Sequence, residues 1–408
     1  MTLYEELKWR GLIKDVTSPE LENKLNNEKL TFYIGTDPTA DSMHIGHYSS
    51  FLIAKRLAKA GHKPLLLIGG ATGRIGDPRP TTEREMKSIE EIEKNTKNLK
   101  KQAEEIFGFE VVDNYDWIKN INIIEFLRDY GKYFNINYML DKDIIRRRLE
   151  TGITFTEFSY MLLQSLDFLH LHETRGVILQ VAGSDQWGNI TSGVDLIRKK
   201  LGDEVYAFTM PLILDQNGKK FGKSEGNALW LDKNKTSSYE LYQYLINTDD
   251  SMIESYLKVF TFLSPEEIMD IVSKHNNEPH LRLGQKTLAR EIITDLHGKE
   301  EYEKAVQISE NLFSGNIKEI NVNDLMIGLK DVPHFILKDE SLLDLLVNNN
   351  ICSSKREARE FLNNNAISVN GEIVNDENMF IDKTKTIEGK IVVIRRGKKK
   401  YYVGLVEE

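Results

Sequence analysis

The first half of the chain alternates short apolar runs with segments of helical periodicity. Four continuous apolar runs predict strands, at residues 31–35, 63–70, 176–183 and 207–215. Such runs are typical of parallel strands that are covered on both faces, whereas a strand with one wet face alternates apolar and polar residues. Strands separated by helical segments predict an α/β fold with a Rossmann-like, doubly wound parallel sheet.

The helical patterns predict several domains. The first helix is expected from about residue 42 to residue 60, with Asp41 or Ser42 as its N-cap and Gly61 just past its end. After residue 216 the apolar spacing is helical, and near residue 341 a short module begins with a helix and an Asn-Gly turn between strands. We expect a Rossmann-like domain with a helical insertion, an α-helical domain, a linker and a small α+β domain, at residues 1–216 (insertion about 110–175), 217–327, 328–340 and 341–408.

Composition narrows the class of protein. The 408 residues are 40% hydrophobic and 29% charged, which is ordinary for a soluble globular protein. The start has no basic segment followed by an apolar one, and no apolar run approaches the roughly 18 residues of a membrane span. The single cysteine, Cys352, excludes an internal disulfide framework and suits a reducing cytosol. We expect a cytoplasmic protein with no membrane partner.

The charge is unevenly distributed. A net charge of −9 argues against a general nucleic-acid coat, but five of the six residues from 395 to 400 are Lys or Arg. A local basic patch can hold phosphates on an acidic protein, because salt confines its field to about 10 Å. A solvated run of charges is the alternative.

Two histidines, His44 and His47, stand where the first predicted strand gives way to a helix. A metal site needs three or four ligands, and no third His, Cys or Glu stands at a suitable local spacing. In a parallel sheet this junction lies at the carboxyl edge, where ligands bind, and a helix N-terminus favours anions. Gly46 lets a ligand approach the backbone. These features predict a phosphate site, with a capped helix and incidental histidines as the alternative.

Several motifs resemble one enzyme family. His44-Ile45-Gly46-His47 matches the HIGH signature of class I aminoacyl-tRNA synthetases, and Lys220-Phe221-Gly222-Lys223-Ser224 is similar to their KMSKS signature. Together with YIGTDPTADSMHIGH, GGATGRIGDP, SYMLLQSLDF and GSDQWGN, these motifs make residues 30–330 resemble the bacterial tyrosyl-tRNA synthetases. The C-terminal module resembles the S4 RNA-binding domain that ends those enzymes.

The resemblance implies a two-step reaction. L-Tyrosine is activated with ATP to tyrosyl-adenylate and pyrophosphate, and the tyrosine then passes to the 3′ end of tRNA(Tyr). The resemblance also implies a homodimer, Mg²⁺ that accompanies ATP, no tightly bound cofactor and no metal ligands on the protein. The insertion at about 110–175, rich in Tyr, Phe and Ile, is the expected subunit interface, although apolar helices are more often plain core.

The resemblance also assigns the ATP end of the site. The expected catalytic residues are Thr39, His44, His47, Lys220, Lys223 and Ser224. The expected contacts of ATP are Gly35, Asp37, His44, Gly46, His47, Gly183, Asp185, Lys220 and Lys223. The carboxylate of the amino-acid substrate is already a nucleophile, so these groups are expected to position the phosphates and to stabilise their charge. The glycine-containing lysine loop is expected to close on the pyrophosphate. Where the family often carries a lysine after Gly-Asp-Pro, Arg79 or Arg84 is the expected replacement.

A polar stripe on one predicted helix is the signal for the amino acid. In TEFSYMLLQSLDFLHL, Tyr160, Gln164 and Asp167 share one face of a helix that is otherwise apolar on nearly all sides. A buried polar stripe serves either a structural network or a polar ligand's pocket. The resemblance favours the pocket and assigns the phenolic hydroxyl to Tyr33 and an ionised Asp167. The remaining expected contacts of tyrosine are Asp77, Tyr160 and Gln164 at the ammonium group and Gln186 near the carboxylate.

The S4-like module is expected to contact RNA phosphates without reading the base sequence. Its candidate residues are Lys355, Arg356, Arg359, Arg395, Arg396, Lys398, Lys399 and Lys400.

Three other interpretations of the chain stay open at this point. A catalytically silent RNA-binding paralogue is expected to have lost active-site residues that this chain keeps. A small nucleotidyltransferase shares the histidine signature but does not need the chain after the lysine loop. A tryptophanyl-type synthetase lacks the S4 module and does not place a carboxylate for a phenol.

Overall fold

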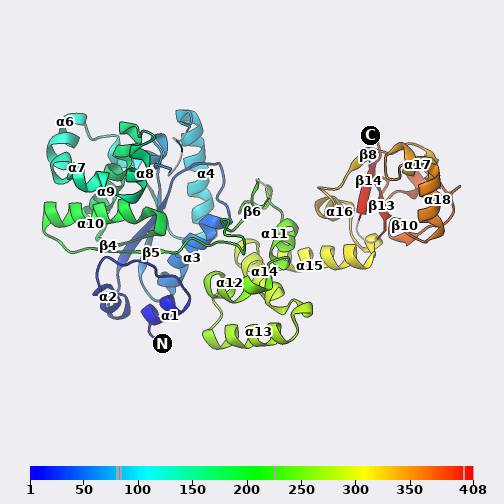
Figure 1. Ribbon diagram of the computed structural model, residues 1–408, viewed down its shortest axis with the longest axis horizontal. Helices are drawn as coiled ribbons and strands as arrows, with labels where there is room; N and C mark the ends of the chain where they lie inside the picture. Colours follow the sequence, from blue (N-terminus) through cyan, green and yellow to red (C-terminus); the bar gives the residue numbers. More distant parts are fainter. Residues whose placement is uncertain (80–81, 83–84, 225–226, 398–399, 408) are drawn as a thin grey trace. The chain divides into compact units, whose positions relative to one another are not determined.

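The computed structural model describes residues 1–408 except 80–81, 83–84, 225–226, 398–399 and 408 (Figure 1). The chain forms two compact units: Met1–Thr236 with Thr248–Ile292, and Ser237–Asn247 with Ile293–Glu408. The expected domain boundaries at residues 216 and 327 therefore fall inside the units rather than between them.

The first unit contains the predicted parallel sheet. Its five strands are β1 (Thr31–Thr36), β2 (Lys63–Ile68), β3 (Glu110–Asp113), β4 (Val177–Gly183) and β5 (Tyr206–Met210). Their spatial order is β3-β2-β1-β4-β5, and every neighbouring pair is parallel. The chain moves outward from β1 to β3 and then returns to the other side of β1. The carboxyl ends of β1 and β4 therefore flank the point where the strand order reverses, which is the usual ligand site of such a sheet.

Two details of the sheet differ from the sequence prediction. Strand β3 was not predicted, because it has only four residues and of these only Val111 is buried. Strand β5 ends at Met210, whereas the apolar run continues to residue 215. Leu212 and Leu214 beyond its end are 39% and 40% exposed, so this part of the run does not belong to a covered strand.

Helix α3 (Ile45–Lys59) begins later than predicted, because His44 is its N-cap. The prediction of Asp41 or Ser42 as the cap is wrong. Asp41 forms an ion pair with Lys235, and the Ser42 hydroxyl donates to the Met43 carbonyl at 3.0 Å. A histidine is rarely a cap, but here the side-chain nitrogen replaces the usual oxygen acceptor.

Helices α9 (Phe155–Arg175) and α10 (Trp187–Leu201) pack against one another and against the sheet. They share a core with β1 and β2 that includes Tyr33, Leu65, Phe168 and Leu196. The other helices of this unit are α1 (Leu3–Trp9), α2 (Leu21–Asn27), α4 (Ile89–Phe107), α5 (Tyr115–Ile118), α6 (Ile123–Glu125), α7 (Ile136–Leu140), α8 (Asp143–Leu149), α12 (Ile253–Phe260), α13 (Pro265–Asn277) and the first part of α14 (Leu283–His297).

The second unit combines helices with a sheet in the order β11-β10-β13-β14-β8. Its helices are α11 (Ser238–Ile246), α15 (Lys299–Ser314), α16 (Val322–Gly328), α17 (Leu342–Asn348) and α18 (Lys355–Asn363). Its strands are β8 (His334–Ile336), β9 (Glu340–Ser341), β10 (Ile367–Val369), β11 (Glu372–Ile373), β12 (Phe380–Ile381), β13 (Ile391–Arg396) and β14 (Lys400–Leu405). Strand β8 lies inside the expected linker 328–340 and pairs in parallel with β14, so part of that segment belongs to the sheet.

Candidate active site

Polar residues of the first unit, several of them predicted from the sequence, gather at the carboxyl edge of its sheet. Asp37 follows β1, Thr72 follows β2, Asn114 follows β3, and Gly183 ends β4, next to Asp185 and Gln186. Helix α9 brings Tyr160 and Asp167 to the same region, as their bonds to Asp37 and Asn114 show. The topology therefore joins segments that are far apart in the sequence into one polar centre.

Asp167 is the most deeply buried acid of this centre. Its side chain accepts hydrogen bonds from Asn114 Nδ2 and Trp117 Nε1, each at 3.0 Å, and the residue is 2% exposed. Burial raises the pKa of Asp167 to about 8 even though both donors lower it. Burial therefore favours the protonated carboxyl in the ligand-free protein. The expected ionised group concerns the site with tyrosine bound and stays a prediction.

Asn114 and Trp117 were not predicted as site residues. They follow β3, the strand that the apolar pattern did not predict, so nothing placed them at the edge of the sheet. The signal that was available is the run Asn114-Tyr115-Asp116-Trp117, which holds two side chains with N–H donors shortly after an apolar pair at residues 111–112.

The Tyr33 hydroxyl is buried next to this carboxyl and has no hydrogen-bond partner among the described residues. Burial, followed by the nearby Asp167, raises the pKa of Tyr33 well above its ordinary value. On the neighbouring strand, Gln180 pairs with Tyr33 in register, and its Oε1 atom is also buried without a partner in the described structure. Buried polar atoms are nearly always bonded, so these groups fit a polar ligand in the same place.

A chain of hydrogen bonds joins Asp167 to Tyr160. Asn114 Nδ2 also donates to Thr72 Oγ1 at 3.0 Å, and that hydroxyl donates to Asp37 Oδ1 at 2.7 Å. The Tyr160 hydroxyl donates to Asp37 Oδ2 at 2.9 Å. Gln164, on the same helix as Tyr160 and Asp167, is partly buried.

Asp77 lies in a second polar group. Gln186 Nε2 donates to Asp77 Oδ2 at 2.8 Å, and Asn189 Nδ2 donates to Asp77 Oδ1 at 3.1 Å. Asn189 was not predicted as a site residue. Its Nδ2 atom also donates to Gln186 Oε1 at 2.9 Å, so the three side chains are all bonded to one another. The structure thus brings the predicted Asp77 and Gln186 together.

The two histidines form a turn at the start of α3. Gly46 N–H donates to His44 Nδ1, and His44 N–H donates to His47 Nδ1, both at 3.1 Å. Because each Nδ1 is an acceptor, the ring hydrogen of each neutral imidazole is on Nε2. Burial, followed by the neighbouring His44, lowers the pKa of His47 to about 3. His47 is therefore a neutral donor across the physiological pH range.

The lysine loop is attached to this turn through its backbone. Ile45 N–H donates to the Leu229 carbonyl, and Leu231 N–H donates to the Met43 carbonyl, each at 2.8 Å. Gly222 has a φ of +82°, and a Cβ at this position would lie 1.8 Å from Ile45 Cγ2. Lys220 is exposed, whereas the side chains of Lys223 and Ser224 lie outside the described part of the structure; their backbone forms strand β6 (Lys223–Ser224), paired with β7 (Asn227–Ala228).

The remaining predicted residues of the ATP end lie along the same edge. Gly35 and Thr39 are exposed, and a Cβ on Gly183 would lie 2.7 Å from Asp185 Oδ1. Arg79 is exposed, and Arg84 lies outside the described residues.

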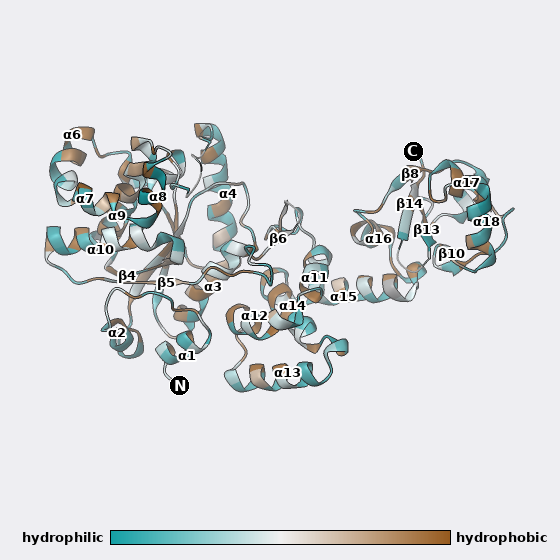
Figure 2. Ribbon diagram, viewed as in Figure 1, coloured by the Kyte–Doolittle hydropathy of each residue, from teal (hydrophilic) through white to brown (hydrophobic). Residues whose placement is uncertain are grey.

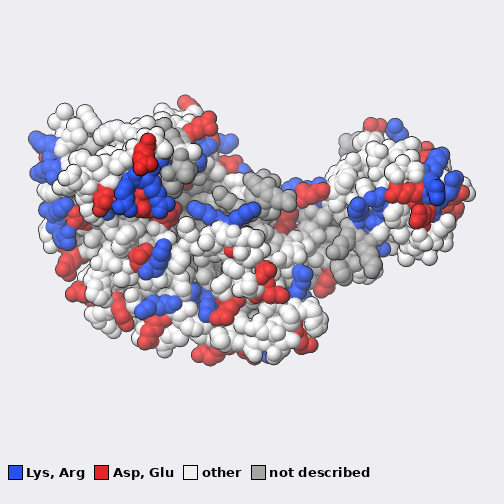
Figure 3. Space-filling view, in the orientation of Figure 1, with Lys and Arg blue, Asp and Glu red and all other residues white. Residues whose placement is uncertain are grey.

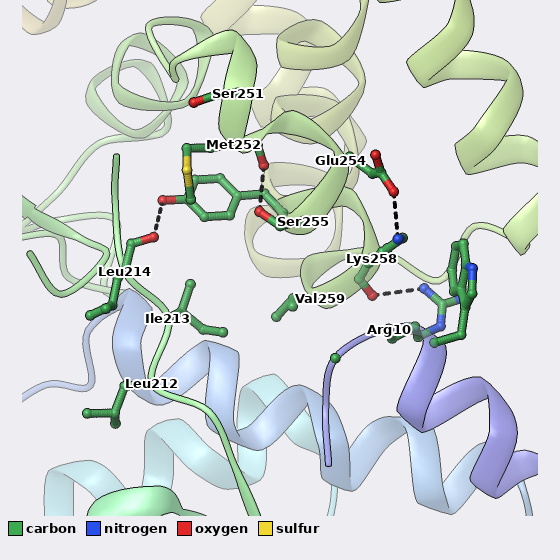
Figure 4. A pocket seen from close by; sticks show the side chains of 13 residues that line it. Arg10, Leu212, Ile213, Leu214, Ser251, Met252, Glu254, Ser255, Lys258 and Val259 are labelled. Carbon is green, nitrogen blue, oxygen red and sulfur yellow. Dashed lines mark hydrogen bonds and ion pairs between the residues drawn. The ribbon is translucent and has the colours of Figure 1, made fainter. Parts of the chain in front are cut away.

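A hollow of about 540 Å³ lies between the end of α1, residues 212–214 and α12 (Figure 4). Several of its lining side chains are bonded to their neighbours: Tyr256 OH donates to the Leu214 carbonyl at 2.9 Å, and Lys258 pairs with Glu254 at 2.6 Å. The residues that line it include none of the predicted site residues. The hollow is therefore separate from the polar centre.

The basic residues of the second unit are partly paired. Figure 3 shows Lys and Arg mixed with Asp and Glu around α18. Lys355 pairs with Asp344 at 2.6 Å, and Arg359 pairs with Glu377 at 2.5 Å. Arg396 donates to the Ile351 carbonyl and is 17% exposed. The other candidates differ: Arg356 and Lys400 are exposed, Arg395 is partly buried, and Lys398 and Lys399 lie outside the described residues.

Two kinds of feature are absent from the described residues. Within them, no helix is both long and apolar enough to cross a membrane. The same residues contain no group of three or more His, Cys, Asp or Glu side chains that could hold a metal ion.

Comparisons with known proteins identify relatives over the whole chain. The family model "tRNA synthetases class I (W and Y)" matches residues 25–314, and "Tyrosine--tRNA ligase SYY-like C-terminal domain" matches residues 324–404. A tyrosine–tRNA ligase of Macrococcus caseolyticus is 50% identical over 410 residues, which cover 98% of each chain. One of Listeria monocytogenes is 49% identical over 415 residues, which cover 99% of each chain. The crystal structure of a C-terminally truncated mitochondrial tyrosyl-tRNA synthetase of Aspergillus nidulans matches with a TM-score of 0.67 at 34% identity, covering 76% of this chain and 94% of that one.

The raised pKa of Asp167 gives a testable dependence of stability on pH. Between the ordinary aspartate pKa of about 4 and the folded value of about 8, the folded protein binds more protons than the unfolded chain. Stability therefore falls as pH rises through this window, by up to about 1.4 kcal/mol per pH unit, and is level above it. Asp167→Asn removes this titration.

We expect the free energy of unfolding of the wild type to fall relative to Asp167→Asn as pH rises, measured by denaturant unfolding at pH values from about 5 to about 9. The asparagine amide of Asp167→Asn lies next to two N–H donors, which lowers the stability of the variant by the same amount at every pH. This constant difference does not affect the dependence on pH. Parallel curves for the two proteins across the range would show that Asp167 is already ionised.

Proposed function

This chain belongs to the class I tRNA synthetases of tryptophan and tyrosine and acts as a tyrosine–tRNA ligase, and we propose that the groups around Asp167 select its amino acid. The enzyme activates L-tyrosine with ATP to tyrosyl-adenylate and pyrophosphate, and then transfers tyrosine to the 3′ end of tRNA. The observation that carries the proposed site is the buried Asp167 carboxyl beside the unpartnered hydroxyl of Tyr33.

The phenolic hydroxyl of the substrate lies between these two groups. It donates to an oxygen of Asp167 and accepts from the Tyr33 hydroxyl, which satisfies the buried atom that lacks a partner in the described structure. Phenylalanine has no hydroxyl, so it leaves the buried Tyr33 hydroxyl without a partner and removes the substrate's bond to Asp167, which costs binding free energy. Tryptophan does not place a hydroxyl there either.

The ammonium group of tyrosine binds at the opposite end of the polar chain. After burial itself, Asp37 and Asp77 contribute most to the raised pKa of Tyr160, so Tyr160 lies in a region of negative potential. That potential attracts the ammonium cation, and Gln164 and Asp77 complete its contacts. Gln186, fixed by Asp77 and Asn189, then lies near the reacting carboxylate.

The ATP phosphates bind at the histidine turn. The Nε2 hydrogens of His44 and His47, Gly46 and the N-terminus of α3 supply donors without a fixed positive side-chain charge. Lys220 and Lys223 supply the cations, with Thr39 and Ser224 beside them. Asp185 holds the ribose, and Gly35 and Gly183 allow the nucleotide to approach the backbone at the edge of the sheet.

The chemical step needs no protein base. The tyrosine carboxylate attacks the α-phosphate, and pyrophosphate leaves, so the protein contributes position and stabilisation of the charge that develops on the phosphates. Mg²⁺ enters with the ATP phosphates as part of the substrate.

The second unit binds tRNA(Tyr). Arg356, Arg395 and Lys400 are its principal described candidates, since Lys355, Arg359 and Arg396 already bond to groups of the protein. Because tRNA and ATP are its substrates, we place the enzyme in the cytoplasm.

The enzyme forms a homodimer through its helical insertion. Exposed apolar side chains occur there: Ile123, Ile124, Leu127, Ile136 and Phe155 are between 53% and 71% exposed. Figure 2 shows hydrophobic residues on α6, within this insertion. A patch of this kind is typical of a surface that another protein covers. A second copy is the occupant that the resemblance implies.

Amino-acid-dependent ATP–pyrophosphate exchange tests the tyrosine site. We expect exchange with tyrosine alone among the standard amino acids. In Asp167→Ala we expect a fall of roughly 100-fold in kcat/KM for tyrosine, because the buried hydroxyl of the substrate and the donors of Asn114 and Trp117 lose their common partner. Glu173→Ala, an exposed change on the same helix, is the matched control.

The other outcomes of this assay are equally informative. Exchange with tryptophan or phenylalanine would mean that the pocket is assigned wrongly. A folded protein that binds tRNA but exchanges with no amino acid would be the silent RNA-binding paralogue.

Phe155→Asp tests the dimer. Phe155 is 71% exposed and is the first residue of α9, where an aspartate is favourable for the helix, so the variant is expected to fold. Sedimentation should show a dimer for the wild type and the 47.0 kDa monomer for the variant, because a charge is buried at the interface. Ile373→Asp, at a comparably exposed site in the second unit, should remain a dimer. A dimeric Phe155→Asp would place the interface elsewhere.

A further inference from the structure

Helix α9 makes two different contacts with the indole of Trp117. The indole N–H donates to Asp167 Oδ1 at 3.0 Å, and the indole ring stacks on the imidazole of His170, with the ring centres 4.5 Å apart and the planes inclined by 14°. Asp167 and His170 are three residues apart, so they lie on the same side of the helix. One side of α9 therefore presents a hydrogen-bond acceptor and a flat ring to a single indole.

The segment that carries Trp117 has little support of its own. Helix α5 has only four residues, too few for a helix that is stable in isolation, and none of the four is fully buried. Trp117 itself is partly buried at the margin of the core that α9, α10 and the sheet share. The orientation of its indole therefore depends on the two contacts with α9.

The stack is the interaction that His170 offers within the described structure. Its ring makes no hydrogen bond or ion pair with a described residue. His172, two positions later, differs: it bonds to the Val177 carbonyl at 2.8 Å and to Asp203 at 3.1 Å. Burial lowers the pKa of His170 and favours the neutral ring. A neutral ring without polar partners acts on its surroundings through packing, and here it packs on the indole.

A contribution to stability alone is the alternative explanation of this stack. Aromatic pairs stabilise proteins wherever they occur, and the loss of such a pair changes a reaction only through the fraction of folded enzyme. The location argues for a more specific role. Within the described residues, Trp117 is one of two side chains that donate to the Asp167 carboxyl, and a rotation of the indole breaks one of these two bonds.

We propose that His170 is a positioning residue for the recognition of tyrosine: stacked on Trp117, it holds the indole N–H against Asp167 and so orients the carboxyl that binds the phenolic hydroxyl. This proposal rests on the proposed function of the site. His170 touches no substrate in it and acts only through the indole. Its loss therefore weakens the binding of tyrosine and leaves the binding of ATP unchanged.

The test compares His170→Leu and His170→Phe with the wild type in the full-length enzyme. Leucine is apolar but has no flat ring, whereas phenylalanine keeps a ring for the stack. We expect the KM for tyrosine in pyrophosphate exchange to rise roughly 3-fold to 10-fold in His170→Leu, which is the effect of one hydrogen bond, with kcat and the KM for ATP unchanged. His170→Phe should restore the wild-type KM, and the exposed control Glu173→Ala should retain it.

Three results of this comparison would overturn the proposal. One is a folded His170→Leu with the wild-type KM for tyrosine. Another is a fall in kcat with no change in either KM, which would assign His170 to stability alone. The third is a His170→Phe that binds tyrosine as weakly as His170→Leu, because the ring is the feature that acts. If His170→Leu does not fold, His170→Gln, which has no ring either, takes its place with the same expectations.

A second set of variants tests the route through the indole N–H. Trp117→Phe keeps an aromatic ring but has no N–H to donate, so it should raise the KM for tyrosine by itself. Adding His170→Leu should raise this KM no further, because both changes remove the same hydrogen bond. Additive effects would contradict the proposal, since His170 would then act on tyrosine without Trp117.

The titration of Asp167 gives a readout that needs no reaction. The bond from Trp117 lowers the pKa of Asp167 against the larger effect of burial, so its loss should raise that pKa above about 8. Stability that depends on the protonated carboxyl is lost as pH rises through the folded pKa, so in His170→Leu the fall should continue to a higher pH than in the wild type. Denaturant unfolding from about pH 5 to about pH 10 measures this difference, and identical pH dependence in the two proteins would overturn the proposal.

The proposed function and this proposal fail in different ways. A wild-type enzyme without tyrosine-dependent exchange would overturn both together. Normal exchange in the wild type, with neither the KM for tyrosine nor the titration of Asp167 changed in His170→Leu, overturns this proposal alone.

Discussion

The burial of one carboxyl, that of Asp167, determines how the polar groups of the site are arranged. A carboxyl out of water needs hydrogen-bond partners, and the two partners here, Asn114 and Trp117, both follow β3. Asn114 bonds Asp167 and Thr72 with its two hydrogens, and it accepts from the Ala71 N–H at 2.7 Å with its oxygen. Because Thr72 in turn holds Asp37, a change at Asp167 reaches the other end of the pocket. The sheet supplies the geometry, and the buried acid is the reason that its edge is lined in this way.

The proposed ATP end follows the opposite design. His44 and His47 lie in a hydrogen-bonded turn, and burial keeps His47 neutral, so in the proposed site these donors hold phosphate oxygens without a fixed positive charge. The cations are placed on a separate loop, where Lys220 is exposed to water. Neutral donors in fixed positions favour the geometry of the transition state, and a charge that stays solvated until ATP arrives costs little in the free enzyme. The histidine turn thus supplies neutral hydrogen-bond donors, and the lysine loop supplies positive charge.

The sequence predicted the parallel sheet and four of its five strands, because continuous apolar runs are a strong local signal. It could not predict β3, with one buried residue, and therefore missed Asn114 and Trp117. The histidine cap was missed for a different reason: side-chain preference at caps favours oxygen acceptors, and only tertiary structure shows a nitrogen in that role. Charge patterns failed similarly at Arg396, which sequence places in a basic run and the structure places against a backbone carbonyl. Local chemistry is visible in a sequence, whereas the partner of a side chain depends on the fold.

Gly222, in the lysine loop, is a glycine for a structural reason that the sequence around it does not show. A glycine between Phe221 and Lys223 reads as freedom for the loop to close, but Gly222 has a left-handed backbone and no room for a Cβ against Ile45. Its backbone carbonyl accepts from Leu229 at 3.1 Å, and Leu229 in turn accepts from Ile45. The base of the loop is therefore part of the same structure as the histidine turn. In the proposed mechanism, the two signatures therefore act from one backbone unit, in which the histidine turn is bonded to the segment that carries the lysines.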